Sequence, residues 1–254
     1  MKPWQRNGLK CMPILPDVIV LCGGAGLRLR SITGDAPKVM ARIAGRPFME
    51  LLLRQIRRHE FSRIIMAVGY QKEAIRSHFG YETFGLRLTY SEEAKPLGTG
   101  GALRNAAELL ESDTALVMNG DSYTDLDLRQ FVIDHRAAKL DVSLAVVSAD
   151  GRVDCGSVVA DESGKLTGFT EKGDGVGAPY LNAGIYVFSK RLLLEIPFGT
   201  EISLERELLP RWLAEGRSMR SFLAGGSCVD IGTPERFWEA QEALVSAEQV
   251  ATKS

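Results

Sequence analysis

The chain has 254 residues, of which 45% are hydrophobic and 25% charged, and its 31 basic and 32 acidic side chains leave a net charge of −1. This length can bury the core of one large α/β domain. The balanced charge argues against an extended nucleic-acid or membrane-binding surface, so any cationic field is local and suits a small polyanion. No stretch reaches the roughly 20 uninterrupted apolar residues of a membrane-spanning helix.

The N-terminus and the cysteines predict a cytoplasmic protein. Residues 1–16 contain three prolines and few periodic apolar positions, which predicts a loose leader, with Met12 as an alternative start. This segment lacks the apolar region of a secretory signal. The cysteines form no C-x-x-C pair and have no neighbouring histidine, so they indicate neither a zinc site nor a redox motif. They are Cys11, Cys22, Cys155 and Cys228.

A glycine-rich turn follows the first buried strand, which is predicted over 18–22 from its apolar, β-branched residues. Glycines allow left-handed torsions and close approach, so successive backbone N–H groups can surround an anion. The glycines are Gly23, Gly24 and Gly26, and the basic residues that follow are Arg28, Arg30 and Lys38. The combination indicates phosphate binding.

Two familiar glycine motifs do not fit this turn. The dinucleotide pattern requires a third glycine where this chain has Leu29, and no G-x-x-x-x-G-K-[ST] follows the strand. Taken alone, the residues fit a plain strand-to-helix turn with solvated arginines about equally well, because such turns are common. The motifs further along the chain favour phosphate binding.

The next elements alternate between helix and strand. Apolar spacing predicts helices over 48–59 and 72–79, a buried strand over 63–68 and a short strand over 86–90. Ligands bind at the carboxyl ends of strands in α/β sheets, so Gln71, just after the strand over 63–68, is a candidate contact. A role in a surface turn is the alternative.

A second glycine-rich stretch runs from Glu92 to Leu103 and reads E-E-A-K-P-L-G-T-G-G-A-L. It predicts a strand-to-helix junction whose backbone donors suit a ligand at the helix N-terminus. Thr99 is placed to contact that ligand, to cap the helix, or to do both.

A strand predicted over 114–118 ends in Asn119-Gly120-Asp121. A carboxylate beside a glycine that admits a ligand suits a hard divalent cation, and Mg²⁺ ordinarily takes one or two protein carboxylates. Asp127 is predicted to cap a helix over 128–139, which leaves Asp121 for the metal.

Beyond a strand over 142–147, the pattern changes to strands and turns. Strands are predicted over 157–160, 166–171 and 180–188, with a hairpin signal at 161–165.

Two further helix starts are predicted near the C-terminus. Ser203 caps one helix, although Arg206 stands where a capping box has Glu or Gln. Thr233, followed by Pro234, caps the last helix, which is predicted over 235–247.

Five ordered motifs resemble those of the sugar-1-phosphate nucleotidyltransferases, over about residues 17–245. They are G-G-x-G-x-R-L…T…P-K at 23–38, L-G-T at 97–99, N-G-D at 119–121, E-K at 171–172 with N-A-G at 182–184, and D-I-G-T-P at 230–234. The chain departs from the family at Leu27, where Thr or Ser is usual, so a hydroxyl contact to phosphate is missing.

This resemblance implies a Rossmann-like, GT-A-like α/β fold in which helices flank a mixed, mainly parallel sheet. It implies one domain over residues 17–248. The nucleotide-binding half covers about 17–148 and the β-rich, sugar-phosphate-binding half about 149–248. A homodimer is usual for relatives.

The resemblance also implies residue roles. Arg28 and Lys38 neutralise charge at the α-phosphorus, and Asp121 and Asp230 bind Mg²⁺. The sugar phosphate is assigned to Glu171, Lys172 and Asn182. The nucleotide is assigned to Leu21, Gly23, Gly24, Ala25, Gly26, Gln71, Glu93, Leu97, Gly98, Thr99, Asn119 and Gly120.

The implied reaction joins a sugar 1-phosphate and a nucleoside triphosphate into a nucleoside-diphosphate sugar and releases pyrophosphate. The chain looks most like the guanylyltransferases that convert D-glycero-α-D-manno-heptose 1-phosphate and GTP into GDP-heptose for bacterial surface polysaccharide. Glu92 and Glu93 would then accept hydrogen bonds from guanine N1–H and N2–H. Mannose- and glucose-1-phosphate nucleotidyltransferases using GTP, UTP, dTTP or CTP are alternatives, as is a non-catalytic nucleotide-sugar sensor.

Overall fold

The computed structural model describes residues 14–24, 26–150, 156–170, 178–226 and 228–251, without the side chains of 245–251. Three of the expected site residues, Ala25, Glu171 and Lys172, lie outside the described residues. Most of the expected leader, including Met12, lies outside them as well.

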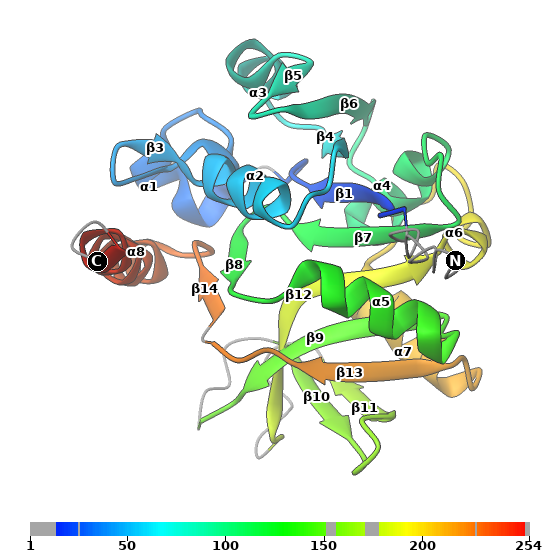
Figure 1. The fold of residues 1–254 in the computed structure, drawn as a ribbon. Coiled ribbons are helices and arrows are strands. Elements are labelled where there is room, and N and C mark those ends of the chain that lie inside the picture. The colour runs from blue at the N-terminus through cyan, green and yellow to red at the C-terminus, as the bar shows by residue number, and fades with distance from the viewer. Residues whose placement is uncertain (1–13, 25, 151–155, 171–177, 227, 252–254) are drawn as a thin grey trace, which may run out of the picture.

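The strands expected in the first half form the parallel centre of the sheet. In the order β7-β1-β4-β6 they are Thr114–Asn119, Asp17–Leu21, Arg63–Val68 and Leu86–Glu92, and the short β5 (Glu82–Thr83) lies antiparallel at the edge (Figure 1). The register places Leu21 opposite both Ala67 and Asn119. The carboxyl ends of the parallel strands therefore meet at one edge.

The second half extends the same sheet, mainly with antiparallel pairs. Strand β12 (Tyr180–Ser189) runs antiparallel to β7, β9 and β10. The other strands are β9 (Val142–Ser148), β10 (Ser157–Ala160), β11 (Leu166–Thr170) and β13 (Met219–Leu223). Within the described residues, ten strands thus form one mixed sheet to which both halves contribute.

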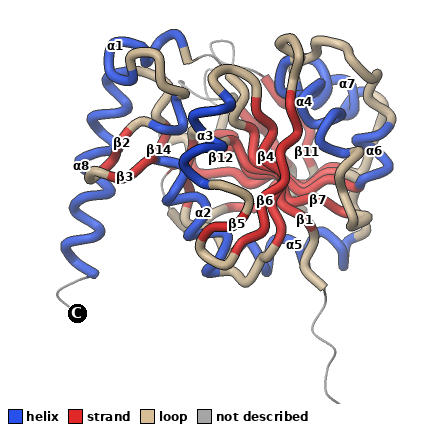
Figure 2. The backbone as a smooth tube through the Cα atoms, turned by 90° about the horizontal axis from the view of Figure 1, so that it is seen from above, coloured by secondary structure: helices blue, strands red, loops and turns tan. Residues whose placement is uncertain are grey.

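Helices cover both faces of the sheet, because successive side chains of a strand point to opposite sides. On β1, Val18 and Val20 enter one core and Ile19 enters the other. The first core includes side chains of α2 (Phe48–Arg58), α3 (Lys72–Phe79), α5 (Leu128–Ala138) and α8 (Pro234–Ala251). The second core includes side chains of α4 (Gly98–Ala107), α6 (Lys190–Leu194), α7 (Leu209–Ala214) and the π-helix η3 (Leu204–Leu208) (Figure 2). No helix in the described part of the chain combines the length and apolar character needed to cross a membrane.

Short elements follow the glycine turn, and two small ribbons lie off the main sheet. The helical turns are η1 (Leu27–Leu29), α1 (Arg30–Thr33) and η2 (Lys38–Met40), and the first ribbon is β2 (Arg42–Ile43) with β3 (Arg46–Pro47). The second ribbon pairs β8 (Ser122–Thr124) with β14 (Cys228–Asp230), so that Asp230 lies opposite Ser122. The backbone N–H of Ile231 also donates to the Asp121 carbonyl at 3.0 Å. These contacts hold the last strand beside the N-G-D turn.

The predicted caps at Asp127, Ser203 and Thr233 are confirmed, because each side chain accepts the N–H three residues later, at 2.9, 3.1 and 3.4 Å. At Ser203 the reciprocal capping bond is shifted by one position. Glu207 accepts the Ser203 N–H at 2.9 Å, so position 206 does not need Glu or Gln. The shift fits η3 being a π-helix, whose turn is wider than that of an α-helix.

Candidate functional site

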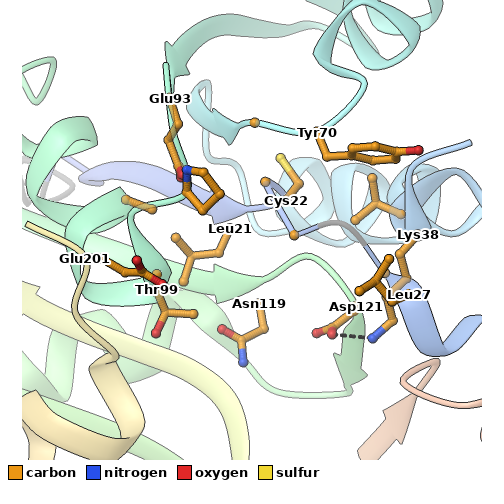
Figure 3. A pocket seen from close by; sticks show the side chains of 18 of the residues that line it. Leu21, Cys22, Leu27, Lys38, Tyr70, Glu93, Thr99, Asn119, Asp121 and Glu201 are labelled. Atoms are coloured by element: carbon orange, nitrogen blue, oxygen red, sulfur yellow. Dashed lines mark hydrogen bonds and ion pairs between the residues drawn. The ribbon is translucent and has the colours of Figure 1, made fainter. Parts of the chain in front are cut away.

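A cavity of about 900 Å³ opens at the carboxyl ends of β1, β4, β6 and β7. Ligands bind at this edge in α/β sheets. Figure 3 shows side chains from widely separated segments around the cavity. The expected site residues on its wall are Leu21, Gly23, Gly24, Gly26, Arg28, Lys38, Glu93, Gly98, Thr99, Asn119 and Asp121.

The glycine turn forms one side of the cavity. A β-carbon added at Gly24 would meet no atom within 4 Å, so this position faces open space. Gly26 has a φ of +60°, and a β-carbon there would lie 2.8 Å from Cβ of Lys38. Any larger residue at position 26 would therefore strain the backbone and displace Lys38. The turn leaves room for a ligand and allows Lys38 to pack closely against it.

The two cations on this wall have different partners. Arg28 is exposed and forms no ion pair with any described residue. Lys38 Nζ, in contrast, lies 2.6 Å from Oδ2 of Asp121 (Figure 3). Burial by itself would raise the pKa of Asp121, but the charge of Lys38 and hydrogen bonds from Lys38 and Ser122 hold that pKa below its ordinary value. Asp121 is therefore ionised near neutral pH.

The β8–β14 ribbon holds the backbone of Asp230 beside that of Asp121. Asp121 directly precedes β8, and Asp230 ends β14 opposite Ser122. Oδ1 of Asp230 accepts the Gly232 N–H at 2.5 Å and Nη1 of Arg236 at 3.0 Å. The described residues contain no cluster of three or more His, Cys, Asp or Glu that could hold a metal. Two carboxylates without soft ligands fit Mg²⁺, because phosphates and water complete its shell.

Glu92 and Glu93 have different surroundings. Glu92 pairs with Lys72 at 2.6 Å and also with Arg76, both on α3. Glu93 lies on the cavity wall and accepts the Leu97 N–H at 3.0 Å. Burial raises the pKa of Glu93, although the bond from Leu97 opposes this shift. The structure therefore corrects the expectation that both carboxylates face the base, because Glu92 is engaged by α3.

The glycines after Leu97 make room for another segment of the protein. A β-carbon at Gly98, Gly100 or Gly101 would lie 2.4 to 2.6 Å from an atom of segment 200–208. The N–H groups of Gly100 and Gly101 both donate to the Ile202 carbonyl, at 2.9 and 3.3 Å. These donors at the start of α4 are thus used within the protein, contrary to the expectation that they meet a ligand.

Thr99 does not cap α4. The helix begins at Gly98, and its N-cap is Leu97, which makes no side-chain capping bond. The Thr99 hydroxyl donates to Oε2 of Glu205 at 2.6 Å and accepts the Leu204 N–H at 2.8 Å. Thr99 therefore lies on the cavity wall while its hydroxyl connects α4 to η3.

The N-G-D and N-A-G motifs meet between β7 and β12. Gly184 has a φ of +71°, and a β-carbon there would lie 2.9 Å from Nδ2 of Asn119. The Oδ1 atom of Asn119 is buried without a hydrogen-bond partner among the described residues. Asn182 accepts the Gly184 N–H at 3.0 Å and donates to the Tyr186 hydroxyl at 2.7 Å. Gly184 thus makes room for the Asn119 side chain, and Asn182 lies two residues before it on β12.

Five of the expected contacts are not on the cavity wall. Gln71 is the exposed N-cap of α3, and Tyr70 lies on the wall instead. Leu97 and Gly120 do not line the cavity but lie next to residues that the chain packs around it. Gly120 packs so closely that a β-carbon there would lie 2.7 Å from the Leu21 carbonyl. Asp230 and Asn182 lie off the wall, next to residues that border it.

The cavity also includes residues that the sequence motifs did not single out. They are Cys22, Tyr70, Lys95 and Glu201, together with further small and apolar residues. The first three lie at predicted strand ends or in the second glycine-rich stretch, so the predicted positions of these segments could have identified them. Glu201 lies in the loop before η3, and no local pattern marks it.

Cys22 is not a nucleophile in this cavity. Its thiol donates to the Ala67 carbonyl at 3.2 Å. Burial, assisted by the charge of Glu93, raises its pKa far above neutrality. Because the thiolate is the reactive form of cysteine, this site lacks an activated sulfur.

Known guanylyltransferases are similar to this chain over most of its length. Mannose-1-phosphate guanylyltransferase of Mycobacterium tuberculosis is 38% identical over 231 residues, which are 90% of this chain and 64% of that enzyme, so this chain spans less than two thirds of its length. D-glycero-alpha-D-manno-heptose 1-phosphate guanylyltransferase of Aneurinibacillus thermoaerophilus is 30% identical over 228 residues, which are 90% of this chain and 98% of that enzyme.

Solved structures and a family model extend the comparison. The crystal structure of HddC from Yersinia pseudotuberculosis matches with a TM-score of 0.80 and 31% identity, covering 91% of this chain and 100% of that chain. A second HddC structure, complexed with GMP-PN, matches equally well. Residues 17–247 match the family described as Nucleotidyl transferase. The chain therefore belongs to the nucleotidyl transferase family of enzymes.

Proposed function

We propose that this enzyme joins GTP and a sugar 1-phosphate into a GDP-sugar and releases pyrophosphate. An oxygen of the sugar phosphate attacks the α-phosphorus of GTP, and the bond from that phosphorus to the oxygen bridging to the β-phosphate breaks. The attacking oxygen is already anionic, so no protein nucleophile is required. The main work of the protein is to align two anions and to offset their charge.

The proposal depends chiefly on one observation, the meeting of the glycine turn, Lys38 and Asp121 at a single cavity. Lys38 is packed against Gly26 and is held in place by Asp121. Arg28 is exposed on the same wall. A cation that is positioned before the reaction stabilises developing negative charge without reorganisation. We therefore assign charge neutralisation at the reacting phosphates to Lys38 and Arg28.

The two carboxylates beside the cavity are assigned to Mg²⁺. When bound, Mg²⁺ offsets charge on phosphate oxygens and orients them for displacement. Asp121 and Asp230 would hold it, because both offer oxygen ligands, and Asp121 directly precedes β8 while Asp230 ends β14, the strand that pairs with β8. Lys38 and Arg236 hydrogen-bond these carboxylates and thereby fix their orientation.

Glu93 favours guanine as the base. Guanine carries adjacent N–H donors on N1 and N2, whereas uracil and thymine offer one N–H donor at the corresponding edge. An ionised carboxylate is an acceptor-only group and suits two neighbouring donors. Glu93 lies on the cavity wall, while Glu92 is engaged by Lys72 and Arg76.

For the sugar we favour D-glycero-α-D-manno-heptose 1-phosphate, with mannose 1-phosphate second. The two sugars share the manno configuration and differ beyond C5 of the ring, where the heptose has one more hydroxylated carbon. The heptose enzyme of A. thermoaerophilus aligns over 98% of its length, whereas the more similar mannose enzyme of M. tuberculosis aligns over 64%. Two heptose enzymes that are 30% and 32% identical to this chain support the heptose, and the higher identity of the mannose enzyme, 38%, supports mannose.

Pyrophosphate release tests the proposal. The purified enzyme is assayed with Mg²⁺, with GTP, ATP, UTP, CTP or dTTP as one substrate and heptose, mannose or glucose 1-phosphate as the other. We expect release only when both substrates are present, with the highest kcat/KM for GTP and the heptose. A preference for another nucleotide would overturn the choice of GTP. Binding of GDP-heptose without any release would instead support a sensor.

A further inference from the structure

A chain of hydrogen bonds runs from the cavity wall to Asn182 through η3. Thr99 Oγ1 donates to Oε2 of Glu205 at 2.6 Å. The second carboxylate oxygen, Oε1, accepts from the Tyr186 hydroxyl at 3.5 Å. The Tyr186 oxygen accepts in turn from Nδ2 of Asn182 at 2.7 Å. One carboxylate thereby connects α4, η3 and β12.

The position of Glu205 is fixed by backbone contacts around it. The Leu204 N–H donates to the Thr99 hydroxyl at 2.8 Å, and the Ile202 carbonyl accepts the Gly100 N–H at 2.9 Å. A β-carbon at Gly98 would already lie 2.6 Å from the same carbonyl, so the two segments are in tight contact. The start of η3 therefore keeps a constant position relative to the start of α4.

The charge of Glu205 determines the direction of the whole chain. A carboxylate accepts hydrogen bonds but cannot donate them, so the Tyr186 hydroxyl has to donate to it. The Tyr186 oxygen then remains as an acceptor for the amide nitrogen of Asn182. The amide oxygen of Asn182 accepts the Gly184 N–H at 3.0 Å. This arrangement fixes the orientation of the Asn182 amide.

We infer that Glu205 is a positioning residue that couples the nucleotide side of the cavity to its sugar-phosphate side. The inference rests on the proposed function and on the roles that the family resemblance implies, the nucleotide at Thr99 and the sugar phosphate at Asn182, which lies next to residues of the cavity wall. Through Glu205, a nucleotide that settles against α4 also stabilises the orientation of Asn182. Networks of this kind can contribute more than the sum of their separate bonds.

Steady-state kinetics with GTP and the preferred sugar 1-phosphate test this role. Glu205→Ala should raise KM for the sugar 1-phosphate about tenfold, the order expected when a hydrogen bond to a charged group is lost, while KM for GTP changes much less. Glu205→Gln keeps the shape and one acceptor oxygen, so it should recover part of the loss. Glu207→Gln is the matched control, because Glu207 is exposed on the same helix and Gln can keep its bond to the Ser203 N–H. Its kinetics should equal those of the wild type.

Two hydroxyl deletions test whether the carboxylate connects the two sides. Thr99→Val and Tyr186→Phe should each raise KM for the sugar 1-phosphate in the wild-type background. Neither should have a further effect in Glu205→Ala, because residues in one network are not additive. The Tyr186 to Glu205 distance of 3.5 Å is long for a bond between oxygens, so Tyr186→Phe is the decisive variant. If either deletion raised KM in the Glu205→Ala background by as much as it does in the wild-type background, the inference would be overturned.

The outcomes separate this inference from the proposed function. If the wild type releases no pyrophosphate with any sugar 1-phosphate, the proposed function fails and the inference fails with it. If the wild type is active and Glu205→Ala keeps the wild-type KM for the sugar 1-phosphate, the inference alone fails. Thermal unfolding checks that each variant is folded, and Glu205→Gln with Tyr186→Phe provides the test if Glu205→Ala does not fold.

Discussion

The Lys38 amine lies 2.6 Å from the Asp121 carboxylate, so the cation assigned to the reacting phosphate and the carboxylate assigned to the metal form one ion pair. Their side chains are 13% and 34% exposed. Removal of one partner from such a shielded pair leaves a charge without compensation. A substitution of either residue should therefore change both the charge of the cavity and the catalysed reaction.

Lys38→Ala should lower kcat for pyrophosphate release about 100-fold to 1000-fold, by analogy with the loss of one preorganised donor. The pKa of Asp121 should also rise, because burial would no longer be offset by the lysine charge. A lowered folded-state pKa stabilises the protein above the unfolded pKa and loses this effect as the pH falls through the folded value. The variant should therefore be less stable than the wild type at neutral pH in urea unfolding. Release at the wild-type rate would refute the assignment of Lys38.

Glu93→Gln should weaken GTP binding about 10-fold to 100-fold, because a charged acceptor for two N–H donors is lost. Burial raises the folded-state pKa of Glu93, so this group favours folding below its unfolded pKa and loses that contribution as the pH rises through the folded value. The unliganded variant should therefore unfold at a higher temperature than the wild type at neutral pH. Calorimetric titration of a non-hydrolysable GTP analogue measures the first effect and thermal unfolding the second.

The same carboxylate predicts a pH dependence of binding. The affinity of the wild type for the GTP analogue should fall as the pH is lowered through the raised pKa of Glu93, since the protonated carboxyl presents only part of its acceptor capacity. Glu93→Gln should show a flatter profile over the same range. Parallel profiles for the two proteins would exclude Glu93 as the source of the dependence.

Gly26→Ala should destabilise the protein by about 1–2 kcal/mol, the cost of a left-handed torsion for a residue with a β-carbon. It should also lower kcat, because the new methyl group would displace Lys38 from its position 2.8 Å away. Gly24→Ala is the matched control for stability, since its methyl group would enter open space. That control should unfold like the wild type but bind nucleotide more weakly. Equal stability of the two variants would contradict the packing described for Gly26.

Asp230→Asn should raise the Mg²⁺ concentration for half-maximal activity by about tenfold or more, as expected when a metal site loses a supporting group. Chelation of Mg²⁺ should abolish pyrophosphate release by the wild type. Asp125→Asn is the control, because Asp125 is an exposed carboxylate that pairs with Arg58 at 2.9 Å on the surface. A Mg²⁺ titration of the three proteins measures the effect, and coincident curves would remove Asp230 from the metal site.

The sequence predicted the local elements well, because each has a strong periodicity. The strand over 63–68 and the helix over 72–79 have the expected bounds, and Asp127 caps its helix as expected. The pairing of β8 with β14 could not be derived from local pattern, since it joins short segments that lie far apart in the chain. The same is true of β13, which lies parallel to β9. Such register depends on the packing of the whole sheet.

In the candidate site, too, the sequence predicted some features and not others. The motifs predicted that Lys38, Asp121 and the glycine turn share a cavity. The glycine turn and Asp121 each follow a strand that ends at this edge, and Lys38 belongs to the same motif as the glycine turn. They did not predict that Glu92 turns to α3, or that Thr99 contacts η3. A single sequence states which side chains can form hydrogen bonds, but the partner of each is determined by tertiary contacts.

The β8–β14 ribbon also has a consequence for protein synthesis. A nascent chain that has left the ribosome through β12 already carries the glycine turn, Lys38 and Asp121, whereas Asp230 is translated later, with β14. The second carboxylate joins the first only when β14 pairs with β8. In a chain made from its N-terminus, the two carboxylates of the proposed magnesium site can therefore come together only after β14 has been translated.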